Sequence, residues 1–427
     1  MTVEDRPVVA GTTAERPVVV AAEAEAGTAT LRNRRGWTFL MAFTSAHFAH
    51  HVSNSLLNPL LPFIRDTFLL SYSQSGLLVS AFALSLGLSN APIGALADRI
   101  GARPVIVVGL FLTGAISVAL AFSGAYWQLL LLLVVMGLIA GSYHAPAAAL
   151  IARAFPPRSR GGAMGFHIIG GHLSFFVAPL VAAMMISAGG TWRSPYLWLA
   201  FAPVLAGVAV WVLAPKDHQR PATSLGRLAV FREVWGVVQL VGPMVSASIV
   251  FQMVYAALLA FTALYLVDAS GVPAALAAVL FGVPQLVGVL ASPLGGSLSD
   301  RLGRRTVILV GMALLGPSFV ALTLVPNELL VVPFVGIGIA AALRATVTEV
   351  LVLDSAPVHR RATVLGAYHL LAQHSGGLGA PLLGVLAATI GINAAYSGVS
   401  WALALCSVLV IVAQRALTVK SAGDDDA

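Results

Sequence analysis

Four polar side chains recur at helical spacing within one apolar run near the start of the chain. His47, His51, Asn54 and Asn58 are separated by four, three and four residues. In an α-helix this spacing places all four side chains on one face. Imidazole and amide groups donate and accept hydrogen bonds, so the face could line a polar cavity that holds a small molecule. The alternative is hydrogen bonding to a neighbouring helix, which the same side chains also provide within membranes.

We expect neither a metal site nor a cofactor. No carboxylate lies on the stripe that contains His47 and His51, although sites for hard or borderline metal ions usually recruit one. The sequence has one cysteine, Cys406, and no match to the phosphate-binding pattern Gly-x-x-x-x-Gly-Lys-Ser/Thr. No set of catalytic residues converges, so an enzyme is the least favoured class.

Three charged residues lie in a later apolar run. Arg344 is well inside it, and such a costly group needs an anionic ligand or a residue of another helix as its partner. Glu349 lies five residues further on, roughly 140° around an ideal helix and poorly placed for a direct pair. A carboxyl group in a medium of low dielectric constant can alternate between protonated and ionised forms. Glu349 is therefore the first candidate for proton coupling, and Asp354, near the end of the run, is the second.

The composition shows why polar groups in these runs are informative. Of the 427 residues, 58% are hydrophobic and only 10% are charged, whereas soluble domains carry about 25% charged residues. The apolar residues must therefore face lipid, and about 20 of them cross a bilayer as a helix. The net charge of +7 does not indicate nucleic-acid binding, because the basic residues cluster between the runs. The runs are 37–62, 73–97, 104–124, 127–153, 162–187, 196–214, 236–266, 272–296, 306–325, 329–355, 362–390 and 395–413.

The fold that we predict is an all-α integral membrane protein with twelve transmembrane helices in two pseudo-symmetric six-helix bundles. Of the 24 Lys and Arg residues, 21 lie on the side of the termini, and this bias places both termini in the cytoplasm. The predicted parts are a disordered cytoplasmic tail at 1–35, bundles at 36–214 and 236–415, a cytoplasmic linker at 215–235 and a cytoplasmic tail at 416–427.

The polar residues within the runs define a candidate substrate site. The third, sixth, ninth and twelfth runs contain no His, Asn, Gln or charged residue, so every third helix is expected at the periphery. Among the histidines, His47, His51 and His369 are rivals of Glu349 for coupling, because imidazole titrates near neutral pH. The candidate substrate-binding residues are His47, His51, Asn54, Asn58, His144, Gln252, Arg344, His369 and Gln373.

A sixteen-residue segment occurs twice. Gly94–Gly109 and Gly296–Gly311 are identical at ten positions, at a constant offset of 202 residues. This repeat indicates an internal duplication, on which many transporters are built. Both segments resemble the signature between the second and third spans of the major facilitator superfamily.

The resemblance implies a gating role for these loops. In the family the aspartate of the motif approaches the start of a helix in the other half. Here Asp98 would meet the eleventh run near Arg361, and Asp300 would meet the fifth run near Gly161. A carboxylate at a helix N-terminus is stabilised by the helix dipole. The gating residues are Gly94, Asp98, Arg99, Gly101, Arg103, Gly296, Asp300, Arg301, Gly303 and Arg305.

Two shorter segments point to a branch of this family. Gly170-Gly171 with Ala178-Pro179 is similar to a motif of drug:proton antiporters. The segments 141–146 (Gly-Ser-Tyr-His-Ala-Pro) and 160–165 (Arg-Gly-Gly-Ala-Met-Gly) resemble fosmidomycin-resistance transporters.

From the resemblance and the repeat we expect a secondary active transporter that works by alternating access. The expected function is proton-coupled efflux of a small organic compound across a bacterial inner membrane. The expected partners are that substrate, a proton and the lipid bilayer, with no nucleic acid, and the expected state is a monomer. One alternative is proton-coupled uptake of a small organic anion that Arg344 contacts. An alternative of another class is a membrane receptor or scaffold that does not transport.

Overall fold

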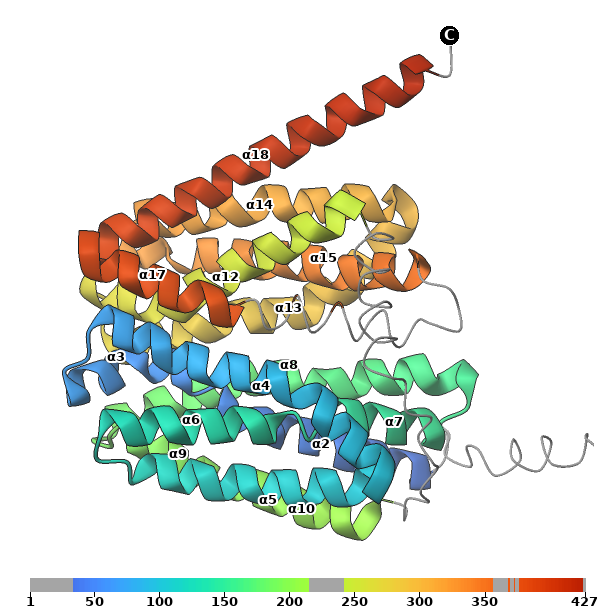
Figure 1. Cartoon of the computed structure of the whole chain (residues 1–427), viewed down its shortest axis with the longest axis vertical. Coiled ribbons are helices and arrows are strands. Elements are labelled where there is room, and N and C mark those ends of the chain that lie inside the picture. The colour runs from blue at the N-terminus through green and yellow to red at the C-terminus, as the bar shows by residue number, and fades with distance from the viewer. Residues whose placement is uncertain (1–33, 215–241, 356–367, 369–371, 373–375, 425–427) are drawn as a thin grey trace, which may run out of the picture.

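The chain is almost entirely helical. A computed structural model describes residues 34–214, 242–355, 368, 372 and 376–424, and helices are the only regular elements in these parts of the chain (Figure 1). Their bounds, in chain order, are α2 (Arg34–Asn54), α3 (Leu57–Phe68), α4 (Tyr72–Ile100), α5 (Ala102–Ala121), α6 (Tyr126–Ala140), α7 (His144–Ala154), α8 (Pro157–Ser187), α9 (Arg193–Leu199), α10 (Phe201–Leu213), α12 (Gly242–Asp268), α13 (Ala274–Leu302), α14 (Arg304–Leu324), α15 (Val331–Ser355), α17 (Gly376–Ile390) and α18 (Ile392–Asp424). A short 3₁₀ turn at Asn327–Leu329 precedes α15.

Many of these helices can cross a membrane. Within the described residues, nine helical segments are long and apolar enough, and α4 makes ten if its two bent parts are taken as one span. The parts of α4 meet at an angle of 44° next to Pro92, which cannot donate the backbone hydrogen bond of a regular helix. Gly377–Ile390 of α17 is a shorter apolar helix. The predicted multi-pass helical membrane protein is confirmed, and twelve spans stay a prediction.

The expected first span is divided into two helices. α2 and α3 cover most of the predicted run 37–62, and Ser55 and Leu56 separate them. Much of the predicted eleventh span, at 362–390, lies outside the described residues, as do the linker at 215–235 and residues 1–33 of the predicted N-terminal tail. The last helix, α18, continues to Asp424 and so includes most of the predicted C-terminal tail at 416–427.

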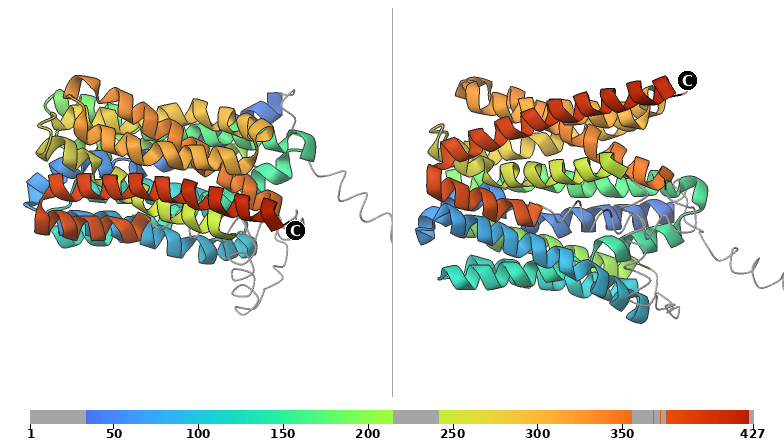
Figure 2. Two further views of the ribbon diagram at one scale, coloured as in Figure 1. Left: turned by 90° about the horizontal axis from the view of Figure 1, so that it is seen from above. Right: turned by 45° about the horizontal axis from the view of Figure 1, so that its top comes forward.

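The helices form two groups that follow the chain. Helices α2 to α10 lie beside helices α12 to α18 (Figures 1 and 2), and α3, α4, α8 and α17 each make their most extensive helix contact with the other group, so two six-helix bundles stay a prediction. The main contacts between the groups join α4 with α17, α8 with α13, and α3 with α12 and α13. In contrast, α5, α10, α14 and α18 make their main contacts within their own group. This agrees with the expectation that every third span is peripheral.

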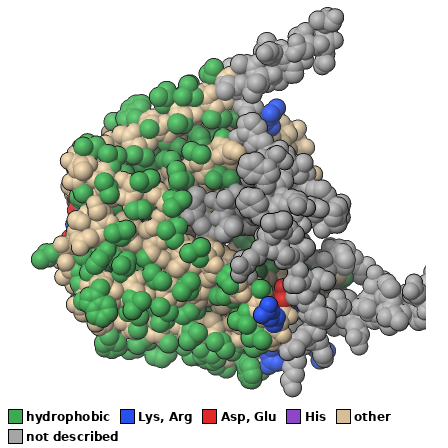
Figure 3. All heavy atoms as spheres, viewed as in Figure 1, with side chains coloured by type: hydrophobic (Ala, Val, Ile, Leu, Met, Phe, Trp, Pro, Cys, Tyr) green, Lys and Arg blue, Asp and Glu red, His purple; other side chains and the backbone are tan. Residues whose placement is uncertain are grey.

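The surface matches a protein that is embedded in lipid. Hydrophobic side chains cover most of the face in Figure 3, and Lys and Arg side chains gather near one edge, where the helices end. On α10 the exposed apolar side chains include Leu205, Trp211 and Val212, and on α18 they include Trp401 and Leu405. That these exposed side chains are apolar follows from the cost of placing ions in hydrocarbon.

The sequence repeat is also a structural repeat. Helices α4 and α13 begin 202 residues apart, at Tyr72 and Ala274, and both have 29 residues. Each ends at a glycine with positive φ, +99° at Gly101 and +86° at Gly303. The next helix starts directly after that glycine in both cases. Glycine suits these turns because a side chain disfavours positive φ.

At one end of the helices, polar contacts join α3 and α4 to α12 and α17. We call it the Arg65 end, and we call the opposite end, where α4 meets α5, the Asp98 end. Arg65 of α3 forms an ion pair with Asp268, the last residue of α12. Tyr72 of α4 donates a hydrogen bond of 2.7 Å to the same carboxylate. Further along α4, Ser80 donates a hydrogen bond of 2.6 Å to the backbone oxygen of Gly377 in α17.

Replacement of Gly101 by alanine tests the role of the turn. We expect Gly101→Ala to lower the thermal stability of the purified protein, because a side chain at positive φ costs roughly 1–2 kcal/mol. The matched control is Gly94→Ala, within helix α4, where an added Cβ would have no atom within 4 Å. There alanine should leave stability unchanged or raise it by about 0.4–1 kcal/mol. Equal melting temperatures of the two variants in detergent would contradict this account of the turn.

Candidate functional site

A buried guanidinium group joins two helices of the second group. The side chain of Arg344 in α15 is 1% exposed. Its Nη1 atom donates hydrogen bonds of 3.0 Å to both the backbone oxygen and Oγ of Ser248 in α12. Its Nη2 atom donates to Oε1 of Gln252, one turn further along α12. The Nε atom is buried and has no hydrogen-bond partner in the described parts of the chain.

Close helix packing holds Arg344 in this place. A Cβ on Gly311 of α14 would lie 2.7 Å from the backbone nitrogen of Arg344, so α14 can approach α15 only because this residue is glycine. Thr348 donates a hydrogen bond of 2.6 Å to the backbone oxygen of Arg344, and its Oγ1 lies 3.0 Å from Oγ of Ser248. The side chain of Arg344 therefore has little freedom to move.

Among the described residues, Arg344 has no anionic partner, and all of its hydrogen-bond acceptors are neutral groups of α12. Of the two kinds of partner considered for Arg344, an anionic ligand or a residue of another helix, these contacts supply the second, and they include no ion pair with Glu349. A buried guanidinium with neutral partners attracts anions, and its planar donors suit carboxylate, sulfonate or phosphate oxygens.

The two candidate coupling residues lie in different surroundings. Glu349 is half-buried on α15, little more than one helical turn beyond Arg344. Asp354 is exposed near the end of the same helix, and its Oδ2 atom lies 3.2 Å from Nε of Arg304. Arg304 also forms an ion pair of 2.5 Å with Asp300 of the second loop motif. Asp354 is thus part of a polar contact at the Asp98 end.

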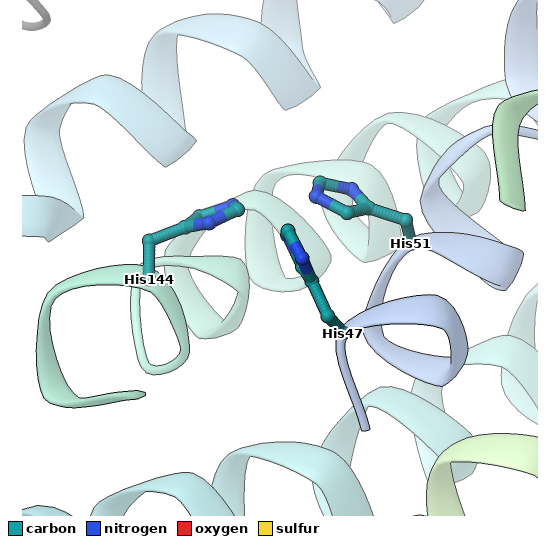
Figure 4. A group of neighbouring side chains, drawn as sticks. All are labelled: His47, His51 and His144. Carbon is teal, nitrogen blue, oxygen red and sulfur yellow. The ribbon is translucent and has the colours of Figure 1, made fainter. Parts of the chain in front are cut away.

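A cluster of imidazole rings occupies the first group of helices. His47 and His51 lie on α2, and His144 is the first residue of α7 (Figure 4). The ring centres are 5.0 Å apart for His47 and His51, 5.3 Å for His47 and His144, and 5.0 Å for His51 and His144. The three residues are buried, half-buried and exposed, respectively.

Local sequence features bring these rings together. Pro146 cannot donate a hydrogen bond to the carbonyl four residues earlier, which explains the break between α6 and α7 just before His144. Gly171 of α8 packs against the ring of His47, and a Cβ there would lie 2.7 Å from it. The ring of His47 also stacks on His167 at 4.3 Å and on Tyr143 at 5.5 Å. The Gly170-Gly171 pair thus makes room for the cluster.

The structure unites only part of the predicted polar stripe. His47 and His51 join His144, whereas Asn54, the last residue of α2, donates a hydrogen bond of 2.9 Å to the backbone oxygen of His50. Asn58 is half-buried in α3, beyond the break between the two helices. Gln252 belongs with Arg344, as described above. The other two candidates, His369 and Gln373, lie outside the described residues.

The residues of the loop motifs lie at the Asp98 end. Asp98 and Arg99 are exposed on the last turn of α4, and Arg103 of α5 donates to the backbone oxygen of Trp211 in α10. The expected meeting of Asp98 with the region of Arg361 falls outside the described residues.

Among the described residues, Asp300 contacts Arg304, so its approach to Gly161 stays a prediction. Gly94, Gly101, Gly296 and Gly303 lie on or directly after α4 and α13, and Arg301 and Arg305 are exposed beside Gly303.

Sequence reasoning missed the hydroxyl groups and the contacts at the Arg65 end. A search restricted to charged, amide and imidazole side chains could not find Ser248, Thr348 or Tyr143. Arg65 and Asp268 were not among the candidate residues, since the two residues lie 203 positions apart and no motif links them.

The two polar sites occupy related positions in the repeat. At the offset of 202 residues, Arg344 corresponds to Ser142, two residues before His144. By the same offset, Gln252 corresponds to His50, the residue before His51 of the imidazole cluster. Gly311 packs on the backbone of Arg344, and its counterpart Gly109 packs on Ser142. Both halves therefore place their polar groups at corresponding positions of corresponding helices.

Comparison with known proteins gives consistent relatives. The chain is 27% identical to the "Probable 4-methylmuconolactone transporter" of Cupriavidus pinatubonensis, over 86% of this chain and 88% of the relative. It is 27% identical to the "Probable sulfoacetate transporter" of Cupriavidus necator, over 62% and 67%. It is also 25% identical to the fosmidomycin resistance protein of Escherichia coli, over 90% and 93%.

The fold and the family model agree with these relatives. A crystal structure of a bacterial homolog to the human lysosomal transporter Spinster, described as inward-facing and unoccupied, matches with a TM-score of 0.72 and 20% identity. It covers 90% of this chain and 96% of that one. The family model described as Major Facilitator Superfamily matches residues 43–292 and 271–425. The matches point to transporters and not to an enzyme, and the chain belongs to the major facilitator superfamily.

Proposed function

We propose that this protein is a secondary active transporter that moves a small organic anion by alternating access. The observation that carries the proposal is the buried guanidinium of Arg344, whose hydrogen-bond partners in the described part of the chain are all neutral. An ion in that position is costly, and an anionic substrate that binds there offsets the cost. The name of one relative contains sulfoacetate, an organic anion, which supports this substrate class.

Twelve spans in two six-helix bundles provide the framework for this movement. The matching lengths of α4 and α13 and their matching glycine turns support two equivalent halves, at 36–214 and 236–415. Substrate sites of such transporters lie near the midplane, between the halves. We place the Asp98 end, both termini and the linker at 215–235 in the cytoplasm of a bacterial inner membrane, because basic residues concentrate there.

The direction of transport is the second element of the proposal. Similarity to the fosmidomycin resistance protein over 90% of this chain supports efflux. Glu349 is the coupling residue that we favour, because Asp354 is exposed and bound to Arg304. Proton entry would neutralise Glu349 and so alter the local field around Arg344 and its anion.

Replacement of Arg344 by lysine tests the substrate site. Lysine keeps the charge but loses the planar donors, so Arg344→Lys should weaken binding of the transported anion at least about tenfold. Loss of one hydrogen bond to a charged group, at about 1.5–3 kcal/mol, corresponds to a change of this size. The measurement is transport by proteoliposomes offered a panel of sulfonated, carboxylated and uncharged compounds.

A matched variant separates binding from stability. Ser248→Ala removes a hydrogen bond to Arg344 but leaves the guanidinium in place, so it should lower thermal stability and preserve anion affinity. If Arg344→Lys transports the anion with an unchanged KM, or if only uncharged compounds are transported, Arg344 is not the anion site.

Replacement of Glu349 by glutamine tests coupling. Glutamine resembles the protonated carboxyl group, so Glu349→Gln should abolish transport driven by a pH gradient while exchange without a gradient persists. Asp354→Asn is the comparison variant, and it should keep its response to the gradient. Proteoliposomes with and without an imposed pH gradient provide the measurement. Normal gradient-driven transport by Glu349→Gln would remove Glu349 from the coupling mechanism.

The ion pair at the Arg65 end should control one of the two closed states. Asp268→Asn removes the charge that joins α3 and α4 to α12, and it should open this end more often. The readout is labelling by an impermeant thiol reagent from outside intact cells, with a cysteine at Ser73 and Cys406 replaced by serine. Asp66→Asn is the matched control, since Asp66 pairs with Arg65 on the same helix. Equal labelling of the two variants would show that the pair does not hold this end closed.

A further inference from the structure

We propose that His47, His51 and His144 form a binding site for one divalent transition-metal ion. From the sequence we expected no metal site, because only His47 and His51 share a helix face and no carboxylate accompanies them. The structure adds His144 from α7, so that three imidazole groups converge (Figure 4). The inference goes beyond anion transport and does not depend on it.

The geometry is close to that of a three-histidine site. One ring nitrogen of each residue can be chosen so that all three lie within 4.8 Å of one another. Around a tetrahedral zinc ion, with bonds of about 2.0–2.1 Å, ligand nitrogens lie roughly 3.4 Å apart. Small rotations of His51 and His144, which are less buried than His47, supply the remaining approach. Three histidines and an open fourth position are a known arrangement for zinc.

The hydrogen bond of His47 prepares its ring for a metal ion. Its Nδ1 atom lies 2.9 Å from the backbone oxygen of His167, which can only accept a hydrogen bond. That contact therefore fixes the proton on Nδ1 and leaves the lone pair on Nε2. The Nε2 atom is buried and has no hydrogen-bond partner among the residues that the structure describes. Metal-binding histidines typically donate their second ring nitrogen to a carbonyl or carboxylate in this way.

The packing around His47 fixes the orientation of the ring. It lies nearly parallel to the neighbouring rings of His167 and Tyr143, with interplanar angles of 11° and 15°. Gly171 also packs against the ring, and a Cβ there would lie 2.7 Å from it. Tyr143 is itself held by a hydrogen bond of 2.7 Å to the backbone oxygen of Phe43. Such support lowers the reorganisation that metal binding requires.

The ligand set selects the kind of ion. Three neutral imidazole nitrogens suit Zn²⁺, Co²⁺, Ni²⁺ and Cu²⁺, whereas Mg²⁺ and Ca²⁺ prefer oxygen ligands. His144 is exposed, so an ion can reach the site from solvent on that side. The fourth position is then available to water or to an oxygen of another ligand.

The test uses the full chain, purified in detergent with an affinity tag that contains no histidine. Zn²⁺ is titrated by calorimetry, and Co²⁺ is titrated while its visible absorption is recorded. The wild-type protein should bind one ion per chain, and Co²⁺ should show the absorption of a tetrahedral complex. A large excess of Mg²⁺ should not displace Zn²⁺.

Single variants assign the ligands. His144→Ala and His51→Ala should each weaken Zn²⁺ binding by at least about 10–100-fold, the loss that even an outer partner of a metal ligand causes. His172→Ala is the matched control, because His172 lies on α8 and is not one of the three proposed ligands. This variant should bind Zn²⁺ as the wild type does. Size-exclusion profiles and helical circular dichroism check that each variant is folded.

Two results would overturn the proposal. One is the absence of stoichiometric Zn²⁺ binding by the folded wild-type protein. The other is equal Zn²⁺ affinity of the wild type and a folded triple variant that combines His47→Ala, His51→Ala and His144→Ala. Neither result bears on anion transport, which the Arg344 variants test separately.

Discussion

The lack of water in the bilayer core is the constraint on which this architecture depends. A backbone in hydrocarbon must satisfy its own hydrogen bonds, so the chain crosses as helices. The same constraint decides where polar side chains can go. Ser117 of α5 donates to the backbone oxygen of Tyr196, and Ser407 of α18 donates to that of Met312. Larger polar groups gather where helices meet, at Arg344 and around His47.

Helix identity and the repeat could be predicted from the sequence because each depends on local or periodic information. Long apolar runs predict spans, and the copies at Gly101 and Gly303 predict equivalent turns. The predicted periphery of every third helix is likewise a consequence of side-chain type alone. The break at Ser55 and Leu56 within the first span was not predicted, although Pro59 marks it: proline has no N–H to donate to the backbone oxygen of Ser55, four residues earlier.

Contacts between helices could not be predicted in the same way. The sequence showed that Arg344 needed a partner, but not that Ser248 and Gln252 would supply neutral acceptors. Likewise, His47 and His51 share a face by spacing, whereas His144 joins them only because α7 packs near α2 after a break at residues 141–143. Glycines such as Gly171 and Gly311 allow two helices to approach closely, but the sequence does not show which helix lies opposite each of them.

The repeated turns and the unmatched polar sites have a consequence for the history of the molecule. After duplication, both copies kept the glycine turn between α4 and α5 and its counterpart between α13 and α14. The paired helices that bear the polar groups diverged, to imidazole in one copy and guanidinium in the other. In the proposed alternating-access mechanism both halves move in the same way, so both glycine turns are under one shared requirement. The polar side chains are not under that requirement, so the two halves could acquire different polar residues while they kept the same turns.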